Sequence, residues 1–377
     1  MGERLPFSSA AYVLLNKLVI ENLKHRPVRT LLSTLAIGVQ VCMILTLEGL
    51  SHGMLEDQAR RSRGIGADIV IRASTATFLS LGEAFTDKYL PFVRKQPHVV
   101  LATGALVRPT GPLTTVTGLD LPEFEKMSGS FRFLSGGIYR KPDDVIVDEY
   151  YARQYHLRVG DSMQMLNRRW RLTGIFEQGK IARIIVPIGL LQELTGNSGK
   201  INVIYIKLDN PANTNEVIDA LKARGMGDLK IYSMEDIQSL YSVKNVPMLP
   251  EVTGVVIGLG VVVGFLVVFL SMYTAVLERT REIGVLKALG ASPGFVLNVL
   301  VRETTLLAVL GSALGILLTY GTRWLIMSFW PGSLIQAIVP EWWPIAAAIA
   351  IAGALLGAAW PGLKAARQDA IEALSYE

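Results

Sequence analysis

Residues 252–277 read VTGVVIGLGVVVGFLVVFLSMYTAVL, and the charged segment ERTREIGVLKALGASPGF follows directly at 278–295. A helix needs about 20 predominantly apolar residues to cross a bilayer, so the first segment predicts a transmembrane span at 251–277. Charged side chains are costly inside hydrocarbon, so the second segment must lie outside it. This junction predicts a membrane protein with a structured elbow at residues 278–303.

Three further apolar segments have the composition of spans, at 30–50, 304–322 and 342–363. The first contains Gln40, and Glu48 is expected to end it early. It does not resemble the short apolar core and small-residue cleavage site of a signal peptide, so we interpret it as a retained span. Four transmembrane helices are therefore expected.

The segment between the first two spans differs from the rest of the chain. Half of all residues are hydrophobic and the mean hydropathy is +0.37, yet residues 51–250 have the composition of a soluble domain. Alternating apolar residues predict strands at 66–74 and 203–209, and a strand leading into a helix at 229–240.

In two more segments of this domain, the order of apolar, polar and turn-forming residues predicts secondary structure. Residues 143–179 are typical of a strand, an amphipathic helix, a turn at 159–161, and two strands joined at Asn167-Arg168. Residues 213–224 predict a helix with Asn213 or Thr214 as its cap. The fold class is thus a membrane protein with four transmembrane α-helices and a large α+β extracytoplasmic domain inserted between helices 1 and 2.

The distribution of Lys and Arg predicts the orientation. Basic residues gather in 1–29, in the elbow and in the tail at 364–377, whereas the loop at 323–341 has only Arg323. The positive-inside rule places the three basic segments in the cytoplasm and residues 51–250 outside it. An aromatic belt at the outer interface would consist of Tyr320, Trp324, Trp330, Trp342 and Trp343. The N-terminal residues suit a helix on the inner leaflet, and a plain extension of the first span explains them almost as well.

Composition argues against several other functions. The net charge of +5 is explained by basic flanks facing anionic lipid, and no basic aromatic patch points to nucleic acid. The one cysteine, Cys42, lies in the first span, so no disulfide is expected in the outer domain. The four histidines lack metal-ligand spacing, and the carboxylates of Asp143-Asp144 and Asp148-Glu149 are expected to be solvated at strand ends. We therefore predict no catalytic, cofactor-binding or metal-binding residue.

A phosphate-binding loop is also not expected. The segment around GNSGK at 196–200 has Leu194 where the leading glycine of a Walker A motif belongs, and Ile201 where Ser or Thr would bind magnesium. The sequence therefore predicts that ATP hydrolysis, if used, takes place in a partner.

Three stretches of the chain resemble the FtsX/MacB-type permeases of ABC transporters, a family that includes lipoprotein-releasing permeases. Residues 277–292, from Leu277 to Ser292, follow the pattern E-R-x-x-E-I-G-x-L-[KR]-A-L-G-A found after the second span of that family. Residues 145–148, 159–161 and 173–176 are similar to its outer-domain strand, V-G-D turn and V-G-I-F strand. Residues 360–374 resemble its ending P-x-x-x-A-A-R-x-x-P-x-E-A-L, with Ala370 in place of proline.

The resemblance implies a permease subunit in a bacterial cytoplasmic membrane, with a MacB-like core domain at 51–250. ATP and magnesium would bind a separate ABC ATPase subunit, and a second permease copy would complete a homodimer or heterodimer in contact with membrane lipids. ATPase closure would shift the elbow, and the outer domains would move to export or extract a lipoprotein, lipid or amphiphile, with an adaptor or other outer partner compatible with this arrangement. The ATPase-coupling residues so implied are Glu278, Arg279, Glu282, Ile283, Gly284, Leu286, Lys287, Leu289 and Gly290.

The elbow pattern by itself is less specific. Ile283, Leu286 and Leu289 recur at helical spacing and predict one apolar face on a short helix that ends at Gly290. Without the resemblance, a helix that merely anchors the elbow at the interface would be preferred. Two alternative functions remain: a signalling subunit that activates an outer partner such as a cell-wall hydrolase, and an anchored receptor without an ATPase. The resemblance favours transport over signalling, because the division-type members of the family have a much smaller outer domain.

Glycines recur four residues apart in three predicted spans, which lets helices approach closely. The pairs are Gly260 with Gly264, Gly311 with Gly315, and Gly353 with Gly357. An interface between two permease copies and packing within one chain explain this spacing equally well.

Overall fold

The computed structural model describes residues 21, 24–76, 82–111, 114–240, 246 and 248–367. Most of the N-terminal segment at 1–29, where a helix on the inner leaflet is predicted, and most of the predicted tail at 364–377 fall outside these residues. The chain divides into two compact units. We call them the helical unit (Met1–Gly49, Glu251–Trp324 and Ile338–Glu377) and the sheet unit (Leu50–Pro250 and Leu325–Ala337).

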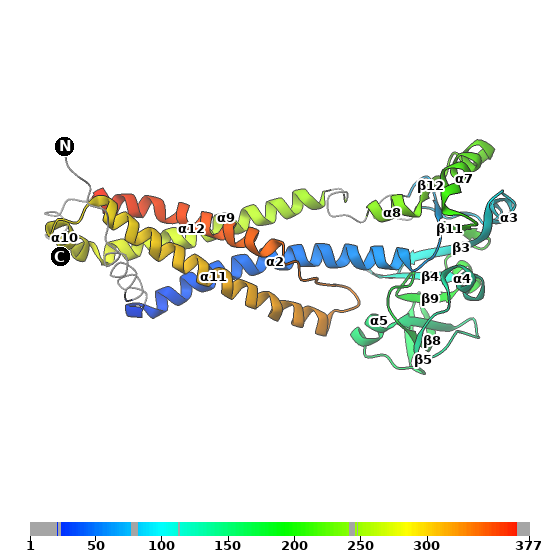
Figure 1. Cartoon of the computed structure of the whole chain (residues 1–377). Helices are drawn as coiled ribbons and strands as arrows, with labels where there is room; N and C mark the ends of the chain where they lie inside the picture. The colour runs from blue at the N-terminus through cyan, green and yellow to red at the C-terminus, as the bar shows by residue number, and fades with distance from the viewer. Residues whose placement is uncertain are drawn as a thin grey trace. The chain divides into compact units, whose positions relative to one another are not determined.

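The helical unit is built on four long helices. They are α2 (Pro27–Arg63), α9 (Leu249–Glu278), α11 (Pro293–Phe329) and α12 (Trp342–Arg367) (Figure 1). Each is long and apolar enough to cross a membrane, which confirms the four-helix prediction. The short helix α10 (Thr280–Ala288) lies between α9 and α11 in the chain.

Two of these helices extend beyond the predicted spans. α2 continues past Glu48, which is buried, so this carboxylate does not end the helix as expected. α11 already begins at Pro293, where the Ser292 hydroxyl accepts a hydrogen bond from the amide of Phe295, and it continues to Phe329. The physical reason is that a charge limits how far a segment enters hydrocarbon but does not break the helical backbone hydrogen bonds.

The core of the helical unit combines large and small side chains. Branched residues of α2, including Ile37, Val41 and Ile44, pack with Val268 and Met272 of α9. α12 contributes alanines spaced four apart, which present one smooth face to these residues: Ala346, Ala350, Ala354 and Ala358.

The sheet unit contains a ten-stranded sheet in the order β12-β1-β11-β3-β4-β9-β6-β8-β5, with β7 pairing to β8. The bounds are β1 Ile69–Arg72, β3 Val99–Pro109, β4 Thr115–Leu119, β5 Phe133–Gly136, β6 Asp144–Asp148, β7 Ser162–Met165, β8 Arg168–Phe176, β9 Ile184–Pro187, β11 Val203–Leu208 and β12 Lys230–Ser233. The pairs β4/β9 and β6/β8 are parallel, and the other pairs are antiparallel. A second sheet pairs β2 (Phe85–Thr86) with β10 (Lys200–Ile201).

Among the residues that the structure describes, six short α-helices accompany the sheet and give the predicted α+β class. They are α3 (Tyr89–Arg94), α4 (Leu121–Ser128), α5 (Glu149–Gln154), α6 (Ile188–Leu194), α7 (Thr214–Leu221) and α8 (Met234–Leu240). The two faces of β1 separate because side chains alternate along a strand: Ile69 and Ile71 join a core with α7, whereas Val70 faces a second core around Phe124.

Local details differ from the sequence prediction in two places. The turn between β7 and β8 uses Leu166 and Asn167, both with positive φ, and Arg168 already pairs with Met165, so the turn lies one residue earlier than expected. At the start of α7, Asn213 occupies the cap position without a side-chain capping bond, because its amide contacts His98 and Asp209 instead.

Candidate functional site

The elbow helix α10 ends in the way its sequence predicts. Gly290 has φ +96°, its amide donates to the Lys287 carbonyl at 2.9 Å, and the Ala291 amide donates to the Leu286 carbonyl at 3.0 Å. These two bonds form a Schellman motif, in which a glycine one residue beyond the cap adopts the left-handed conformation at low cost. Regular helix therefore stops at Ala288, and Gly290 terminates it.

The three apolar residues predicted on one face of α10 differ in burial across that face. Ile283 is buried and packs with Val276, Val296, Leu300 and Ala365. Leu286 is half-buried, and Leu289 is 80% exposed. Each residue turns the helix by about 100°, so six residues move Leu289 roughly 120° away from Ile283. Val285 is also apolar and is 44% exposed, so α10 has two exposed apolar side chains, Val285 and Leu289.

The remaining predicted coupling residues divide between surface and interior. Glu278, Glu282 and Gly290 are exposed, Arg279 and Gly284 are buried, and Lys287 is half-buried. The ammonium group of Lys287 donates to the Ala366 carbonyl at 2.8 Å, which ties the elbow to the end of α12. An aspartate at Gly284 would therefore disturb packing as well as any partner contact.

A buried ion cluster anchors the elbow within the helical unit. Glu303 of α11 is fully buried, and its two oxygens lie 2.7 Å from Arg29 Nη2 and 3.3 Å from Arg279 Nη1. Arg26 and Glu278 form a further ion pair beside it. Buried charges are stable only when paired, so this cluster fixes the start of α2, the N-cap of α10 and the N-terminal third of α11 relative to one another. The sequence analysis treated Glu303 only as the boundary of a span.

The predicted glycine pairs pack against other helices of the same unit. A Cβ at Gly315 would lie 2.6 Å from Val41 Cβ and 2.7 Å from the Gly38 carbonyl oxygen, and one at Gly311 would lie 2.7 Å from Ile37 Cβ. Gly260 and Gly264 face Met43 and Gln40 of α2, while Gly357 faces the backbone of Phe265 and Gly353 faces Val261. These contacts favour packing within one chain over an interface between copies.

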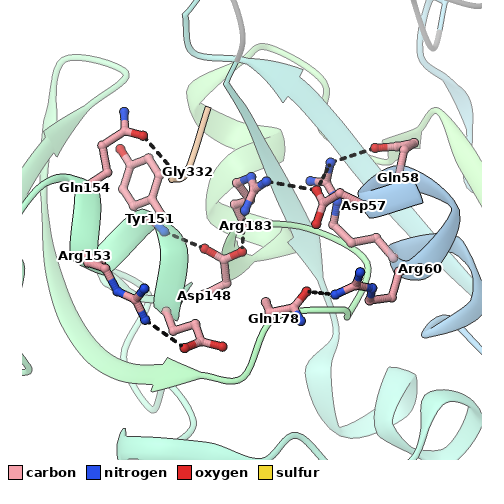
Figure 2. Close-up of polar contacts among 12 residues, drawn as sticks. Asp57, Gln58, Arg60, Asp148, Tyr151, Arg153, Gln154, Gln178, Arg183 and Gly332 are labelled. Atoms are coloured by element: carbon pink, nitrogen blue, oxygen red, sulfur yellow. Dashed lines mark hydrogen bonds and ion pairs between the residues drawn. The ribbon is translucent and has the colours of Figure 1, made fainter. Parts of the chain in front are cut away.

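The sheet unit contains a chain of buried ion pairs (Figure 2). Arg183 bridges two carboxylates: Nη2 lies 2.9 Å from Asp57 Oδ2 of α2, and Nη1 lies 2.9 Å from Asp148 Oδ2 at the end of β6. Arg61 approaches the same Asp57 oxygen at 3.1 Å. This chain therefore fixes the C-terminal part of α2 to the sheet.

The Asp148 carboxylate also caps the helix that follows it. Its other oxygen accepts a hydrogen bond from the Tyr151 amide at 2.7 Å and so caps the N-terminus of α5. Burial raises the pKa of the Asp148 carboxyl, and the Arg183 guanidinium opposes that effect. The expectation that strand-end carboxylates are solvated is thus wrong for Asp148, and also for Asp144, which accepts from the amides of Arg140 and Lys141.

Helix α5 also forms hydrogen bonds with the segment that follows α11. The side chain of Gln154 accepts from the Gly332 amide at 2.9 Å and contacts the Ser333 hydroxyl at 3.1 Å. The sheet unit therefore holds both the end of α2 and residues 332–333 through one polar series (Figure 2). Sequence reasoning missed this series. Only the cap at Asp148 had a local signal, an aspartate directly before a helix.

No cluster of three or more His, Cys, Asp or Glu with metal-binding geometry occurs among the residues that the structure describes. Two features stand out in the described residues. The elbow helix α10 is held by packing and polar contacts and has Leu289 exposed. The large sheet is fixed to the C-terminal end of α2 by ion pairs.

Comparison with known proteins assigns both units. The model of the MacB-like periplasmic core domain matches residues 30–224, and that of the FtsX-like permease C-terminal region matches residues 254–370. The chain belongs to the FtsX/MacB-type permeases of ABC transporters, and it is a multi-pass membrane protein with an extracytoplasmic domain.

Relatives with curated descriptions include two ABC transporter permeases. YknZ of Bacillus subtilis is 33% identical over 39% of this chain and 36% of its own length, and MJ1507 of Methanocaldococcus jannaschii is 28% identical over 43% of each. The macrolide export ATP-binding/permease protein MacB of a Shewanella strain is 24% identical over 97% of this chain and 61% of its own length. The chain thus spans between about a third and three fifths of these relatives.

Solved structures of two related domains also match. The periplasmic region of MacB from Actinobacillus actinomycetemcomitans aligns with 47% of this chain and 94% of its own, at 15% identity and a TM-score of 0.37. The extracellular domain of YknZ aligns with 44% of this chain and 99% of its own, at 10% identity and a TM-score of 0.33.

Proposed function

We propose that this chain is a permease subunit that couples ATP hydrolysis in a separate nucleotide-binding subunit to motion of its extracytoplasmic domain. This motion would export or extract a lipoprotein, lipid or amphiphile. ATP and magnesium would bind the partner, the termini and the elbow would lie in the cytoplasm, and a second permease copy would complete the complex. Family membership supports this assignment.

The observation that carries the proposal is the contrast between the two sides of α10. One side is anchored by Ile283, by the Lys287 bond to α12, and by the Arg279–Glu303 ion pair. The other side presents Val285 and Leu289. An exposed apolar side chain on a firmly held helix suits insertion into a groove of a partner, because a push on that helix would be passed to α2, α11 and α12.

The test changes Leu289 without touching the anchored side. Leu289→Asp should weaken association with the ABC ATPase by at least about tenfold, because a buried, unpaired carboxylate would replace an apolar contact. The measurement is the amount of ATPase that co-purifies in lipid nanodiscs, together with its ATP turnover. The thermal unfolding midpoint of the permease should stay unchanged, because the wild-type side chain is exposed.

Leu134→Asp is the matched control, since Leu134 is an exposed leucine on β5 of the sheet unit. It should leave ATPase binding intact. Full association and turnover of the Leu289→Asp complex would show that α10 does not contact the ATPase through this residue.

A further inference from the structure

The hydrophobic cluster that holds the elbow contains no described residue of α2. Ile283 of α10 packs there with side chains of α9, α11 and α12, and the Lys287 bond adds a second contact with α12. Ion pairs of Arg26 and Arg29 join the start of α2 to the same region. The elbow is thus anchored to three helices by packing and is joined to α2 by charge.

The two ion pairs at the start of α2 differ in burial. Arg26 pairs with Glu278, and their side chains are 35% and 49% exposed. Arg29 lies 2.7 Å from Glu303, and these side chains are 16% and 0% exposed. An exposed pair contributes little because water screens it, whereas separating a buried pair leaves charges in a poorly solvated place. The Arg29–Glu303 pair is therefore the stronger of the two connections.

Glu303 also contacts the point where the chain turns from α9 into α10. α9 ends at Glu278, and Arg279 is the N-cap of α10, with φ −108° and ψ 12° outside the helical conformation. One carboxylate oxygen of Glu303 contacts Arg29, and the other lies 3.3 Å from Arg279 Nη1. Charge-assisted hydrogen bonds are directional, whereas the apolar packing of α2 on its neighbours allows sliding and rotation. Glu303 therefore fixes the first turn of α2 to the α9–α10 junction.

A displacement of this first turn would reach the other end of α2. The helix is continuous from Pro27 to Arg63 and has no internal proline, the commonest cause of a sharp kink. Its C-terminal part is fixed to the large sheet by the ion pair of Asp57 with Arg183 (Figure 2). α2 is thus one uninterrupted element that is held by buried ion pairs near both of its ends.

We propose that Glu303 is a positioning residue through which displacement of the elbow reaches α2, with Arg29 as its partner on α2. The inference rests on the proposed function, because the displacement would come from the ABC ATPase. It separates two roles within that function. ATPase binding depends on the exposed side of α10, whereas transmission to α2 depends on the buried Arg29–Glu303 pair.

Arg29→Met removes this pair and leaves Glu303 with Arg279 as its partner. Nη1 of Arg29 is buried without a hydrogen-bond partner among the residues that the structure describes, so the substitution also removes an incompletely satisfied group. Arg26→Met is the matched control, because it removes the same charge three residues away, from the exposed pair. Arg29→Lys tests for rescue, because its ammonium group can still pair with Glu303.

The experiment uses the full chain with its co-purified ABC ATPase in lipid nanodiscs. It measures ATP turnover, and hydrogen exchange of the amides at 54–63 in α2 without nucleotide and with ATP plus vanadate. Wild type should show an ATP-dependent change in exchange rate there. Arg29→Met should reduce this change at least about fivefold while ATPase association and turnover stay within about twofold of wild type. Arg26→Met should keep the change, and Arg29→Lys should restore at least about half of it.

The outcomes separate this inference from the proposed function. An unchanged response in Arg29→Met, or an equal loss in Arg26→Met, would overturn the inference and leave the ATPase assignment intact. A wild type that hydrolyses ATP with its partner but shows no change at 54–63 would do the same. A lowered unfolding midpoint in Arg29→Met without rescue by Arg29→Lys would show that the pair only stabilises the fold. If no ABC ATPase associates with wild type, the proposed function fails and the inference fails with it.

Discussion

Arg183 is the residue on which the polar interior of the sheet unit depends. It is the shared partner of Asp57 and Asp148, and the side chains of all three are largely buried. Removing one member of a buried ion pair leaves the others charged in a poorly solvated place, which is far more costly than losing a surface pair.

Arg183→Gln should therefore destabilise the sheet unit by about 3–5 kcal/mol. Hydrogen exchange of the β6 and β9 amides in the full chain would measure the opening free energy. Arg132→Gln is the control, because Arg132 pairs with Glu177 at an exposed position and should cost no more than about 1 kcal/mol. Equal effects of the two substitutions would contradict the role given to Arg183.

His98 and Asp209 form an exposed pair whose contribution depends on pH. Their side chains approach to 2.9 Å, and the hydrogen bond raises the pKa of His98 above 6.5 and lowers the pKa of Asp209 below 3.8. The His98 contribution is complete below about pH 6.5 and is lost as pH rises through its raised pKa; the Asp209 contribution is present above about pH 4 and is lost as pH falls through its lowered pKa.

The pair should therefore stabilise the fold most between about pH 4 and 6.5. The difference in thermal midpoint between wild type and Asp209→Asn should be larger at pH 5.5 than at pH 8.5. A difference that is constant across this interval would show that the pair does not titrate as described.

At the scale of elements, glycines such as Gly315 allow the close approach of α11 to α2. Gly315 faces Val41 and the Gly38 carbonyl, whereas Gly321 on the same helix has no neighbour within 4 Å of an added Cβ. The two positions share their backbone conformation and differ in their surroundings.

Gly315→Ala should destabilise the helical unit by about 1–3 kcal/mol because backbone must move. Gly321→Ala should be neutral or stabilising by up to about 1 kcal/mol, since alanine favours helix. Unfolding in mixed micelles with increasing SDS would compare them. If Gly315→Ala instead lowered the dimer fraction and left this unfolding unchanged, the glycine would face a second copy.

Some features of the helices and strands could be predicted from the local sequence, and others could not. The long helices and the strands β1, β6, β7, β8, β11 and β12 follow from hydropathy and periodicity, because each pattern is complete within one segment. The strands β3, β4, β5 and β9 were not predicted. The faces of α10 did not follow, because Val276, Val296, Leu300 and Ala365, which bury Ile283, come from three other segments.

At the scale of the whole molecule, the orientation of the chain is a prediction from its basic flanks. In a Cys42→Ala background, a cysteine introduced by Arg171→Cys should react with an impermeant maleimide in intact cells. One introduced by Leu289→Cys should react only after permeabilisation, because α10 is expected to be cytoplasmic. Both positions are exposed in the structure, so access to the side chain does not limit labelling. The reverse pattern would invert the proposed topology.

The sequence by itself determined the four apolar helices, the inserted α+β domain, the end of α10 at Gly290 and the family resemblance, because each depends on residues close together in the chain. The tertiary structure alone decided that Arg183 meets Asp57 and Asp148, which lie 126 and 35 residues away, and that Glu303 meets Arg29, 274 residues away. Charge partners depend on which distant segments pack together, and no local pattern of residues encodes that choice.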